Sequence, residues 1–284
     1  MSTSLEYRIL PVLQRMGVDI DRLKNSKVLV VGAGGLGSRI VMSLAKYPIG
    51  EIRVVDNSNV DSENVGYQFY PLRMLGKPKA VAIAELAKEF YPWANILGLV
   101  LEAPDIGWYI LGKKLGIQYD IEKRVKDLLD VMRDVDLVIV STDTLGSRAS
   151  VWLASMHLNK PFIDTGFRET YGHVYIWLQG YQCPLDYQLA DLHGFTRAEP
   201  GYPVDPLTAD LIALTAVKMA ISILSRELSE SMLISINMRY KNIDVLNNII
   251  QVYPWAKGVC RHYNVALDSV HKAIKMLAEG GGND

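Results

Sequence analysis

The sequence has few cysteines, almost no net charge and no long uninterrupted hydrophobic run. Two cysteines in 284 residues cannot form a disulfide scaffold or a four-cysteine zinc site, and such usage is typical of a reducing cytoplasm. The 30 basic and 31 acidic residues balance to −1, which gives no support to a nucleic-acid-binding protein. The longest apolar stretch, near Leu211–Leu224, contains Lys218 and falls short of the ~20 residues of a membrane span. The first ten residues contain no apolar signal core, so we expect a cytoplasmic protein without a membrane partner.

The remaining composition is that of a globular α/β protein. Hydrophobic residues make up 49% and charged residues 21%, which excludes wholesale disorder. The length allows one large domain or two small ones. Composition alone therefore says nothing about function, and the order of local patterns has to be considered.

Short β-branched runs alternate with amphipathic segments through the first part of the chain. Strands are predicted at 27–31, 51–55, 96–101, 136–140 and 161–164. Helices are predicted between them at 38–47, 79–90, 121–132 and 148–158. After Gly172, alternating runs at 174–178 and 232–238 flank a predicted helix at 208–228. The order predicts a Rossmann-like doubly wound sheet, mostly parallel, extended by antiparallel strands in the C-terminal half.

Three regions follow from these patterns. Residues 1–24 form an N-terminal helical segment, in which Pro11 is expected to bend the helix. Residues 25–172 are predicted to form the Rossmann-like domain, and 173–284 a C-terminal region continuous with the same sheet. The charged stretch 102–133 is interpreted as an excursion that carries one helix, and 279–284 as a disordered tail.

A glycine-rich loop joins the first predicted strand to the following helix. Gly32, Gly34 and Gly37 match G-x-G-x-x-G, in which one glycine forms the turn, one admits a phosphate and one packs helix on strand. The helix N-terminus adds free N–H groups for an anion. Asp56 ends the second strand, where a carboxylate can accept bonds from ribose hydroxyls. The pattern indicates a nucleotide but leaves its kind open.

Further motifs resemble those of the ThiF/MoeB/HesA proteins and ubiquitin-activating enzymes. Residues 28–38 are close to the opening of that family, and the segment from Asp56 through Asn64 to Gln68 resembles its D-x-D-x-V-x-x-x-N-L-x-R-Q motif. Residues 75–80 are similar to its V-G-x-P-K-A motif. Asp143 with Arg148 five residues later resembles its D-N-x-x-x-R block, and Tyr7-Arg8 its R-Y-x-R-Q segment. The resemblance covers about 5–178 and is weaker beyond.

The resemblance implies an ATP-dependent adenylyltransferase. Such enzymes bind Mg-ATP and adenylate a carboxylate, commonly the C-terminal glycine of a ubiquitin-like or sulfur-carrier protein, with release of pyrophosphate. Carried onto this sequence, the implied nucleotide-binding residues are Gly32, Gly34, Gly35, Gly37, Asp56, Asn64, Gln68 and Lys79. The implied catalytic residues are Arg8, Lys79 and Asp143, of which Asp143 would hold Mg²⁺. Arg8 would reach the ATP of a neighbouring subunit, which implies a homodimer. The resemblance also implies that 25–172 is the ATP-binding domain and that 173–284 is the partner-binding and dimerisation region.

Adenylation of a carboxylate requires residues of the same chemical types. A carboxylate that attacks the α-phosphorus brings two anions together, so cations such as Lys79, Arg8 and a metal are needed. One carboxylate plus substrate phosphates is a sufficient ligand set for Mg²⁺. No general base is needed, because the nucleophile is already ionised at neutral pH.

Two departures from the family pattern leave alternatives open. Tyr67 stands where the family has an arginine that would clamp phosphate, with Arg73 as a possible substitute, and Ser58 replaces the second aspartate. These changes favour a non-catalytic nucleotide-binding or scaffold protein as the alternative. An NAD-dependent oxidoreductase is a further alternative, but it leaves Asn64, Lys79 and Asp143 without a role.

The cysteines also depart from the family. Many members hold structural zinc with two C-x-x-C pairs, whereas this chain has only Cys183 and Cys260, so no zinc site is expected. We hypothesise that the two sulfurs lie close in space. Residues 195–207 contain no cysteine, so no thioester step is evident.

Overall fold

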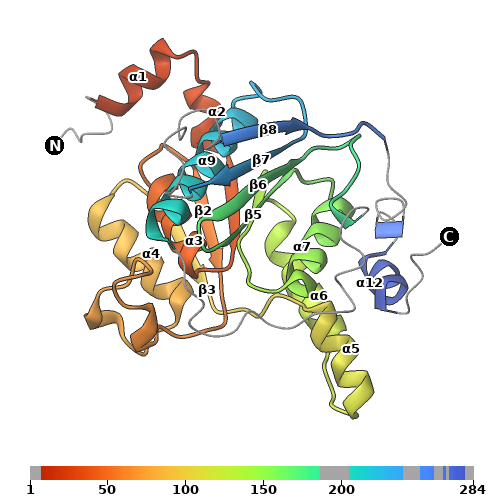
Figure 1. Ribbon diagram of the computed structural model, residues 1–284. Helices are drawn as coiled ribbons and strands as arrows, with labels where there is room; N and C mark the ends of the chain where they lie inside the picture. Colours follow the sequence, from red (N-terminus) through yellow and green to blue (C-terminus); the bar gives the residue numbers. More distant parts are fainter. Residues whose placement is uncertain (1–7, 186–204, 239–249, 259–264, 267–268, 279–284) are drawn as a thin grey trace.

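An eight-stranded sheet forms the centre of the protein (Figure 1). The computed structural model describes residues 8–185, 205–238, 250–258, 265–266 and 269–278. The strand order is β3-β2-β1-β4-β5-β6-β7-β8. The strands are β1 (Lys27–Val31), β2 (Glu51–Val55), β3 (Ile96–Leu99), β4 (Leu137–Val140), β5 (Phe162–Arg168), β6 (Tyr171–Trp177), β7 (Met232–Asn237) and β8 (Ile250–Pro254). Pairing is parallel from β3 through β5 and antiparallel from β5 through β8, which confirms the predicted fold class.

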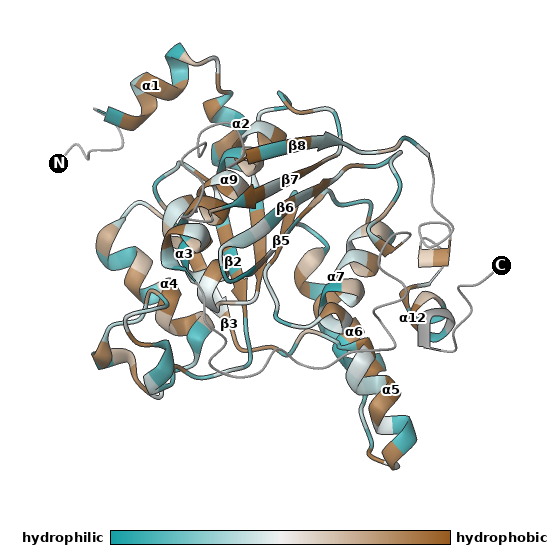
Figure 2. Ribbon diagram, viewed as in Figure 1, coloured by the Kyte–Doolittle hydropathy of each residue, from teal (hydrophilic) through white to brown (hydrophobic). Residues whose placement is uncertain are grey.

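Helices cover both faces of the sheet (Figure 1). One face is packed by α2 (Ile20–Asn25), α3 (Gly35–Leu44), α4 (Lys79–Phe90) and α9 (Pro206–Leu224). The other face is packed by α5 (Ile106–Leu115), α6 (Ile121–Met132), α7 (Leu145–His157) and α12 (Val270–Ala278). The central strand β1 faces both cores, because Val28 and Val30 belong to one and Leu29 and Val31 to the other. Burial on two faces explains its continuous hydrophobic run, and Figure 2 shows hydrophobic residues along the strands at the centre.

The N-terminal segment is broken at a different place from the one expected. Pro11 lies in the first turn of α1 (Leu10–Arg15), where its missing N–H is tolerated. The break comes after α1, at Gly17 with φ +78°, and Asp19 then caps α2 by accepting a hydrogen bond from the Arg22 N–H. The expectation of a bend at Pro11 was therefore wrong.

The excursion at 102–133 carries two helices, so the expectation of one helix was wrong. Asp105 caps α5 by accepting from the Trp108 N–H at 3.1 Å, and Gly116 ends it in the left-handed conformation with φ +68°. The cap and the terminal glycine are sequence signals for a helix. They were missed because α5 leaves several large apolar side chains exposed, so no clear buried stripe marks it.

The helix α9 is long and apolar enough, by length and composition alone, to cross a membrane. In the structure it packs against α3, β5 and β6 and contributes Ile212, Ala216 and Ala220 to the core. This position is that of a core helix. The predicted tail at 279–284 lies outside the described residues.

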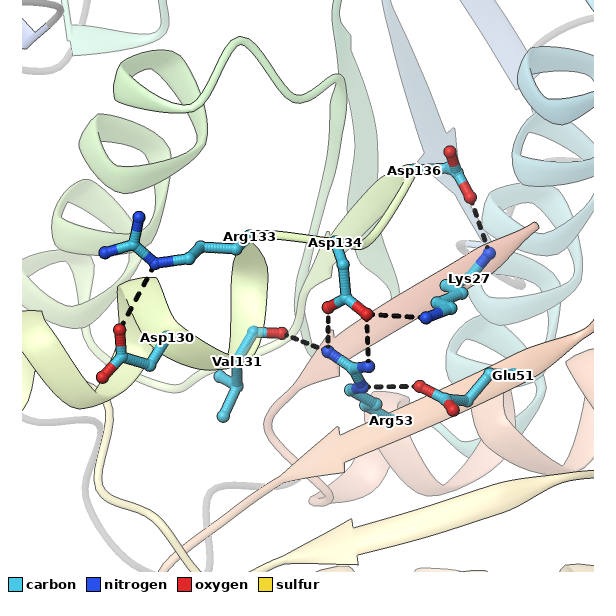
Figure 3. Close-up of polar contacts among 8 residues, drawn as sticks. All are labelled: Lys27, Glu51, Arg53, Asp130, Val131, Arg133, Asp134 and Asp136. Carbon is cyan, nitrogen blue, oxygen red and sulfur yellow. Dashed lines mark hydrogen bonds and ion pairs between the residues drawn. The ribbon is translucent and has the colours of Figure 1, made fainter. Parts of the chain in front are cut away.

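Charged side chains link three segments at the amino edge of the sheet (Figure 3). Arg53 of β2 donates from Nη2 to Asp134 at 2.9 Å and from Nε to Glu51 at 2.6 Å. Lys27 of β1 donates from Nζ to the same Asp134 carboxylate at 2.6 Å. These contacts fasten the chain after α6 to β1 and β2, away from the carboxyl edge that carries the candidate site.

Candidate functional site

The loops after β1, β2 and β4 meet at the carboxyl edge of the sheet. The Gly32 N–H donates to the Val55 carbonyl at 2.8 Å, and the Ser141 N–H donates to the Val31 carbonyl at 2.9 Å. The Asp56 carboxylate accepts from the Ala33 N–H at 2.7 Å, which ties the end of β2 to the glycine loop. In doubly wound sheets this edge is where ligands bind.

The glycines of the loop serve different purposes. Gly32 has φ +98°, and a Cβ on Gly37 would lie 1.9 Å from the Gly32 carbonyl oxygen, so both positions need glycine for packing. A Cβ on Gly34 would meet no atom within 4 Å, so its backbone faces open space. Gly35 is approached by Tyr67, whose hydroxyl would lie 3.0 Å from a Cβ there. Gly34 is therefore the residue whose backbone a ligand can approach.

The N-terminus of α3 opens directly on this loop. Gly34 occupies the N-cap position and supplies no side-chain acceptor, so none caps the N–H groups of the first turn. The helix is ten residues long, and its N-terminal N–H groups and dipole favour an anion.

Lys79 begins α4 on the same side of the sheet. Its backbone N–H donates to the Ser58 carbonyl at 2.9 Å, which fixes the start of the helix beside the loop after β2. Lys79 is half-buried, and its ammonium group forms no ion pair within the described part of the chain, whereas nearby Lys77 pairs with Glu85 at 2.7 Å. Lys79 thus offers a positive charge that no described carboxylate neutralises.

Asp143 follows β4 and is exposed. Thr144, not Asp143, caps α7, because its hydroxyl accepts from the Ser147 N–H at 3.2 Å. The Asp143 carboxylate has no hydrogen-bond or ion-pair partner among the residues that the structure describes. It is therefore available to a cation, and helix capping does not explain its presence.

Asn64 and Gln68 belong to the loop after β2. The Asn64 side chain accepts from the Asp61 N–H at 2.9 Å and forms a capping box with Asp61, so its carbonyl oxygen holds the loop together. The Gln68 Oε1 atom is buried and has no hydrogen-bond partner within the described residues. A buried polar atom left without a partner is a feature of incomplete sites.

Sequence reasoning missed the partner of Tyr67. Arg39 of α3 lies with its guanidinium carbon 5.1 Å from the Tyr67 ring centroid and 5.7 Å from that of Phe69. Its Nη1 donates to the Gly35 carbonyl at 2.7 Å and its Nε to Asp210 of α9 at 2.6 Å. Arg73, considered as a substitute for the missing family arginine, instead pairs with Glu89 on the surface. One sequence signal could have identified Arg39. It is a charged residue, one turn from the start of a helix whose other residues are mostly apolar or small.

Arg8 is the one candidate that lies apart from the others. It is exposed and lies two residues before α1, which projects from the body of the molecule (Figure 1). The structure does not bring Arg8 to the glycine loop of its own chain.

A second charged cluster lies beneath the first turns of α7. The Arg148 Nη1 donates to Asp164 at 3.0 and 2.9 Å, and His173 Nε2 lies 2.9 Å from the same carboxylate. Burial would raise the pKa of Asp164, but Arg148 and then His173 outweigh it and hold the pKa below its ordinary value. Arg148 is thus engaged in the core. Sequence reasoning missed this cluster, since its members lie on a helix and two strands.

Of the two cysteines, Cys183 is buried and belongs to the hydrophobic core that also contains residues of α7 and α12. Cys260 lies outside the described residues, so their hypothesised proximity stays a prediction.

The fold is a doubly wound, Rossmann-like α/β sheet extended by antiparallel strands. The chain belongs to the ThiF family, whose profile matches residues 8–260.

Similar proteins are known by sequence and by structure. The chain is 33% identical over 159 residues to the ubiquitin-like modifier-activating enzyme ATG7 of Yarrowia lipolytica, covering 54% of this chain and 24% of that protein. It is 32% identical over 156 residues to ATG7 of Saccharomyces cerevisiae, covering 55% and 23%. The chain thus spans about a quarter of the length of these relatives. The fold resembles E. coli MccB with ATP, with a TM-score of 0.62 at 20% identity over 85% of this chain and 67% of the other. It also resembles PaaA, with a TM-score of 0.62 at 18% identity over 89% and 84%.

Proposed function

We propose that the protein binds Mg-ATP at the carboxyl edge of its sheet and adenylates a carboxylate, releasing pyrophosphate. One observation carries the proposal: Lys79 and Asp143, both without charged partners in the described structure, belong to the edge where the Gly34 backbone faces open space. An unpaired cation, an unpaired anion and an open glycine backbone suit a phosphate chain with its metal ion. The ATP-bound state of structurally similar MccB supports the choice of nucleotide.

The residues fit the nucleotide in chemical type. The N–H groups at the start of α3 would bind phosphate oxygens. Asp56 accepts from the Ala33 N–H, the Ser58 N–H and the Ser58 hydroxyl, which leaves about one acceptor site for a ribose hydroxyl. Asp143 would hold Mg²⁺ together with phosphate oxygens, and bound Mg²⁺ would neutralise phosphate charge. Asn64 holds the loop after β2 in place, and Gln68 lies within that loop.

The reaction needs positioning and charge neutralisation. An ionised carboxylate oxygen attacks the α-phosphorus, a P–O bond to it forms, and the bond to the pyrophosphate oxygen breaks. Lys79 neutralises charge that accumulates on the phosphate chain during this exchange. No proton has to be removed from the nucleophile.

The acyl substrate we propose is the C-terminal carboxylate of a ubiquitin-like or sulfur-carrier protein, or of a peptide. The matched relatives are named ubiquitin-like modifier-activating enzymes, and MccB has been crystallised with AMPCPP and MccA. A cytoplasmic location, where ATP and such partners are found, is part of the proposal.

A homodimer is also part of the proposal. Val12 of the projecting helix α1 is 43% exposed, and Met16, which follows the helix one turn further on, is 57% exposed. Docking α1 on a second copy would bury these side chains and would bring Arg8 to the partner's site. The same geometry explains why Arg8 lies away from its own glycine loop.

A non-catalytic nucleotide-binding protein is the second candidate, because Tyr67 supplies no positive charge at the phosphate loop. Pyrophosphate exchange into ATP, driven by a C-terminal carboxylate peptide, would separate the two candidates.

The first test is calorimetric titration with Mg-ATP, with NAD as the competing nucleotide. We expect micromolar binding of Mg-ATP that is lost in the double variant Lys79→Ala, Asp143→Ala. The matched control Lys77→Ala, Asp130→Ala removes the same charges from residues paired on the surface and should bind normally. Absence of binding at millimolar Mg-ATP, or NAD binding that ATP does not displace, would contradict the proposal.

A further inference from the structure

The hydroxyl of Tyr67 lies against the glycine loop. A Cβ on Gly35 would stand 3.0 Å from this oxygen and 3.1 Å from the ring, so any larger residue at position 35 would push the ring away by a few tenths of an ångström. Gly35 is the first residue of α3, where uncapped N–H groups already favour an anion. The hydroxyl therefore joins the group of donors at the start of the helix.

The Tyr67 hydroxyl lacks a hydrogen-bond partner in the described structure. Its oxygen is buried and has no hydrogen-bond partner among the described residues. Burial raises the pKa of Tyr67 to about 12, and Arg39 opposes this shift without cancelling it, so the group stays protonated at neutral pH. A buried O–H without an acceptor, beside a phosphate-type loop, is explained if a ligand oxygen supplies the acceptor.

Arg39 holds the ring in this place. Its guanidinium lies over the ring at 5.1 Å, and it is fixed in turn by the Gly35 carbonyl at 2.7 Å and the Asp210 carboxylate at 2.6 Å. The Arg39 side chain is only 7% exposed, so it has little freedom to move away. The ring is thus clamped between the loop and an anchored cation.

We propose that the Tyr67 hydroxyl donates a hydrogen bond to a phosphate oxygen of the bound nucleotide, and that Arg39 is the residue that positions it. The inference rests on the proposed function. Tyr67 would then be an uncharged hydrogen-bond donor to phosphate at the position of a family arginine, and Arg39 would hold its ring in place.

The test compares Mg-ATP with adenosine in calorimetric titrations of the wild type and Tyr67→Phe, which removes one oxygen atom. We expect Tyr67→Phe to weaken Mg-ATP binding about tenfold, the loss typical of a hydrogen bond to a charged acceptor, with adenosine binding unchanged. Tyr91→Phe, at the far end of α4, is the matched control and should change neither affinity. Unchanged Mg-ATP binding, or equal losses for both ligands, would overturn the inference and leave the proposed function intact. A wild type that binds no Mg-ATP would overturn both.

The role of Arg39 needs a readout beyond stability. Arg39→Met should weaken Mg-ATP binding in the wild type but add little in the Tyr67→Phe background, because its effect on binding passes through the missing hydroxyl. Equal losses in both backgrounds would show that Arg39 does not act through Tyr67.

Discussion

The guanidinium of Arg39 lies over the ring of Tyr67, at 5.1 Å from its centroid, and so joins α3 to the loop after β2. This contact is expected to stabilise the fold as well as the site. In a double-mutant cycle with Arg39→Met and Tyr67→Leu, urea unfolding should give a coupling free energy of about 1 kcal/mol, typical of a largely desolvated cation–π pair. Additive losses would show that the two side chains do not interact.

Alanine substitutions at two glycines of the loop, Gly34 and Gly37, should have different effects on stability and on nucleotide binding. Gly34→Ala meets no atom within 4 Å and should change the free energy of unfolding by less than about 0.5 kcal/mol, yet weaken Mg-ATP binding at least tenfold by covering the backbone. Gly37→Ala places a Cβ 1.9 Å from the Gly32 carbonyl oxygen and should destabilise by about 3 kcal/mol or more, or prevent folding. Thermal melts and nucleotide titrations of both variants test this. Normal stability of Gly37→Ala would contradict the observed packing.

Asp164 should make the free energy of unfolding depend on pH. Its pKa is lowered in the folded protein, so its contribution is present at neutral pH and is lost as the pH falls from the ordinary carboxyl range through the folded pKa. Asp164→Asn leaves Arg148 buried without its anion and should cost about 3–5 kcal/mol at pH 7. The difference from wild type should shrink in unfolding measurements at acid pH. A difference independent of pH would contradict the assignment.

Asp134 provides the contrasting case. Its contacts to Arg53 and then Lys27 hold its pKa below the ordinary range, but its side chain is 50% exposed (Figure 3). Asp134→Asn should therefore cost less than about 1 kcal/mol at neutral pH, and added salt should reduce the loss. A salt-independent loss as large as that of Asp164→Asn would show that exposure does not decide the difference.

Arg226 follows α9 in the left-handed conformation, with φ +59°. The Glu227 N–H donates to the Ser222 carbonyl at 2.9 Å, as expected for a helix end of this type. Arg226→Gly should stabilise the protein by about 1 kcal/mol, because glycine adopts this conformation without strain. Arg226→Ala keeps the Cβ and should bring no such gain, so equal melting temperatures of the two variants would count against the explanation.

Local signals predicted most of the parallel half of the sheet. The helices at 79–90 and 121–132 and the strands at 27–31 and 51–55 have the bounds expected from periodicity. The strand expected at 161–164 extends as β5 to Arg168, because it pairs with β6 over that length. This extension depends on a partner strand and has no signal within the segment itself. The exposed apolar side chains of α5 similarly concealed a helix that its capping residues mark.

The sequence predicts those residues of the candidate site that directly follow a strand. Gly34, Asp56 and Asp143 each follow a strand, and parallel strands bring such positions to one edge. The environment of Tyr67 was not predictable, because it depends on Asp210 and Arg39, which come from helices far apart in the sequence. Chain order alone also could not show that Thr144 takes the capping role and leaves Asp143 unpaired.

The separation of Asp143 from the helix cap has a genetic consequence. A substitution at Asp143 removes a charge that no described residue uses for folding, so the altered protein should accumulate to its normal level. If the protein adenylates an acyl partner as a dimer, as proposed above, the altered protein would still occupy that partner and join mixed dimers in a cell that also carries the unaltered copy. Its effect would then be dominant. A substitution at Thr144 would instead weaken α7 and lower abundance, and its effect would be recessive. Substitutions at the adjacent residues Asp143 and Thr144 would thus be inherited differently, the first as dominant and the second as recessive.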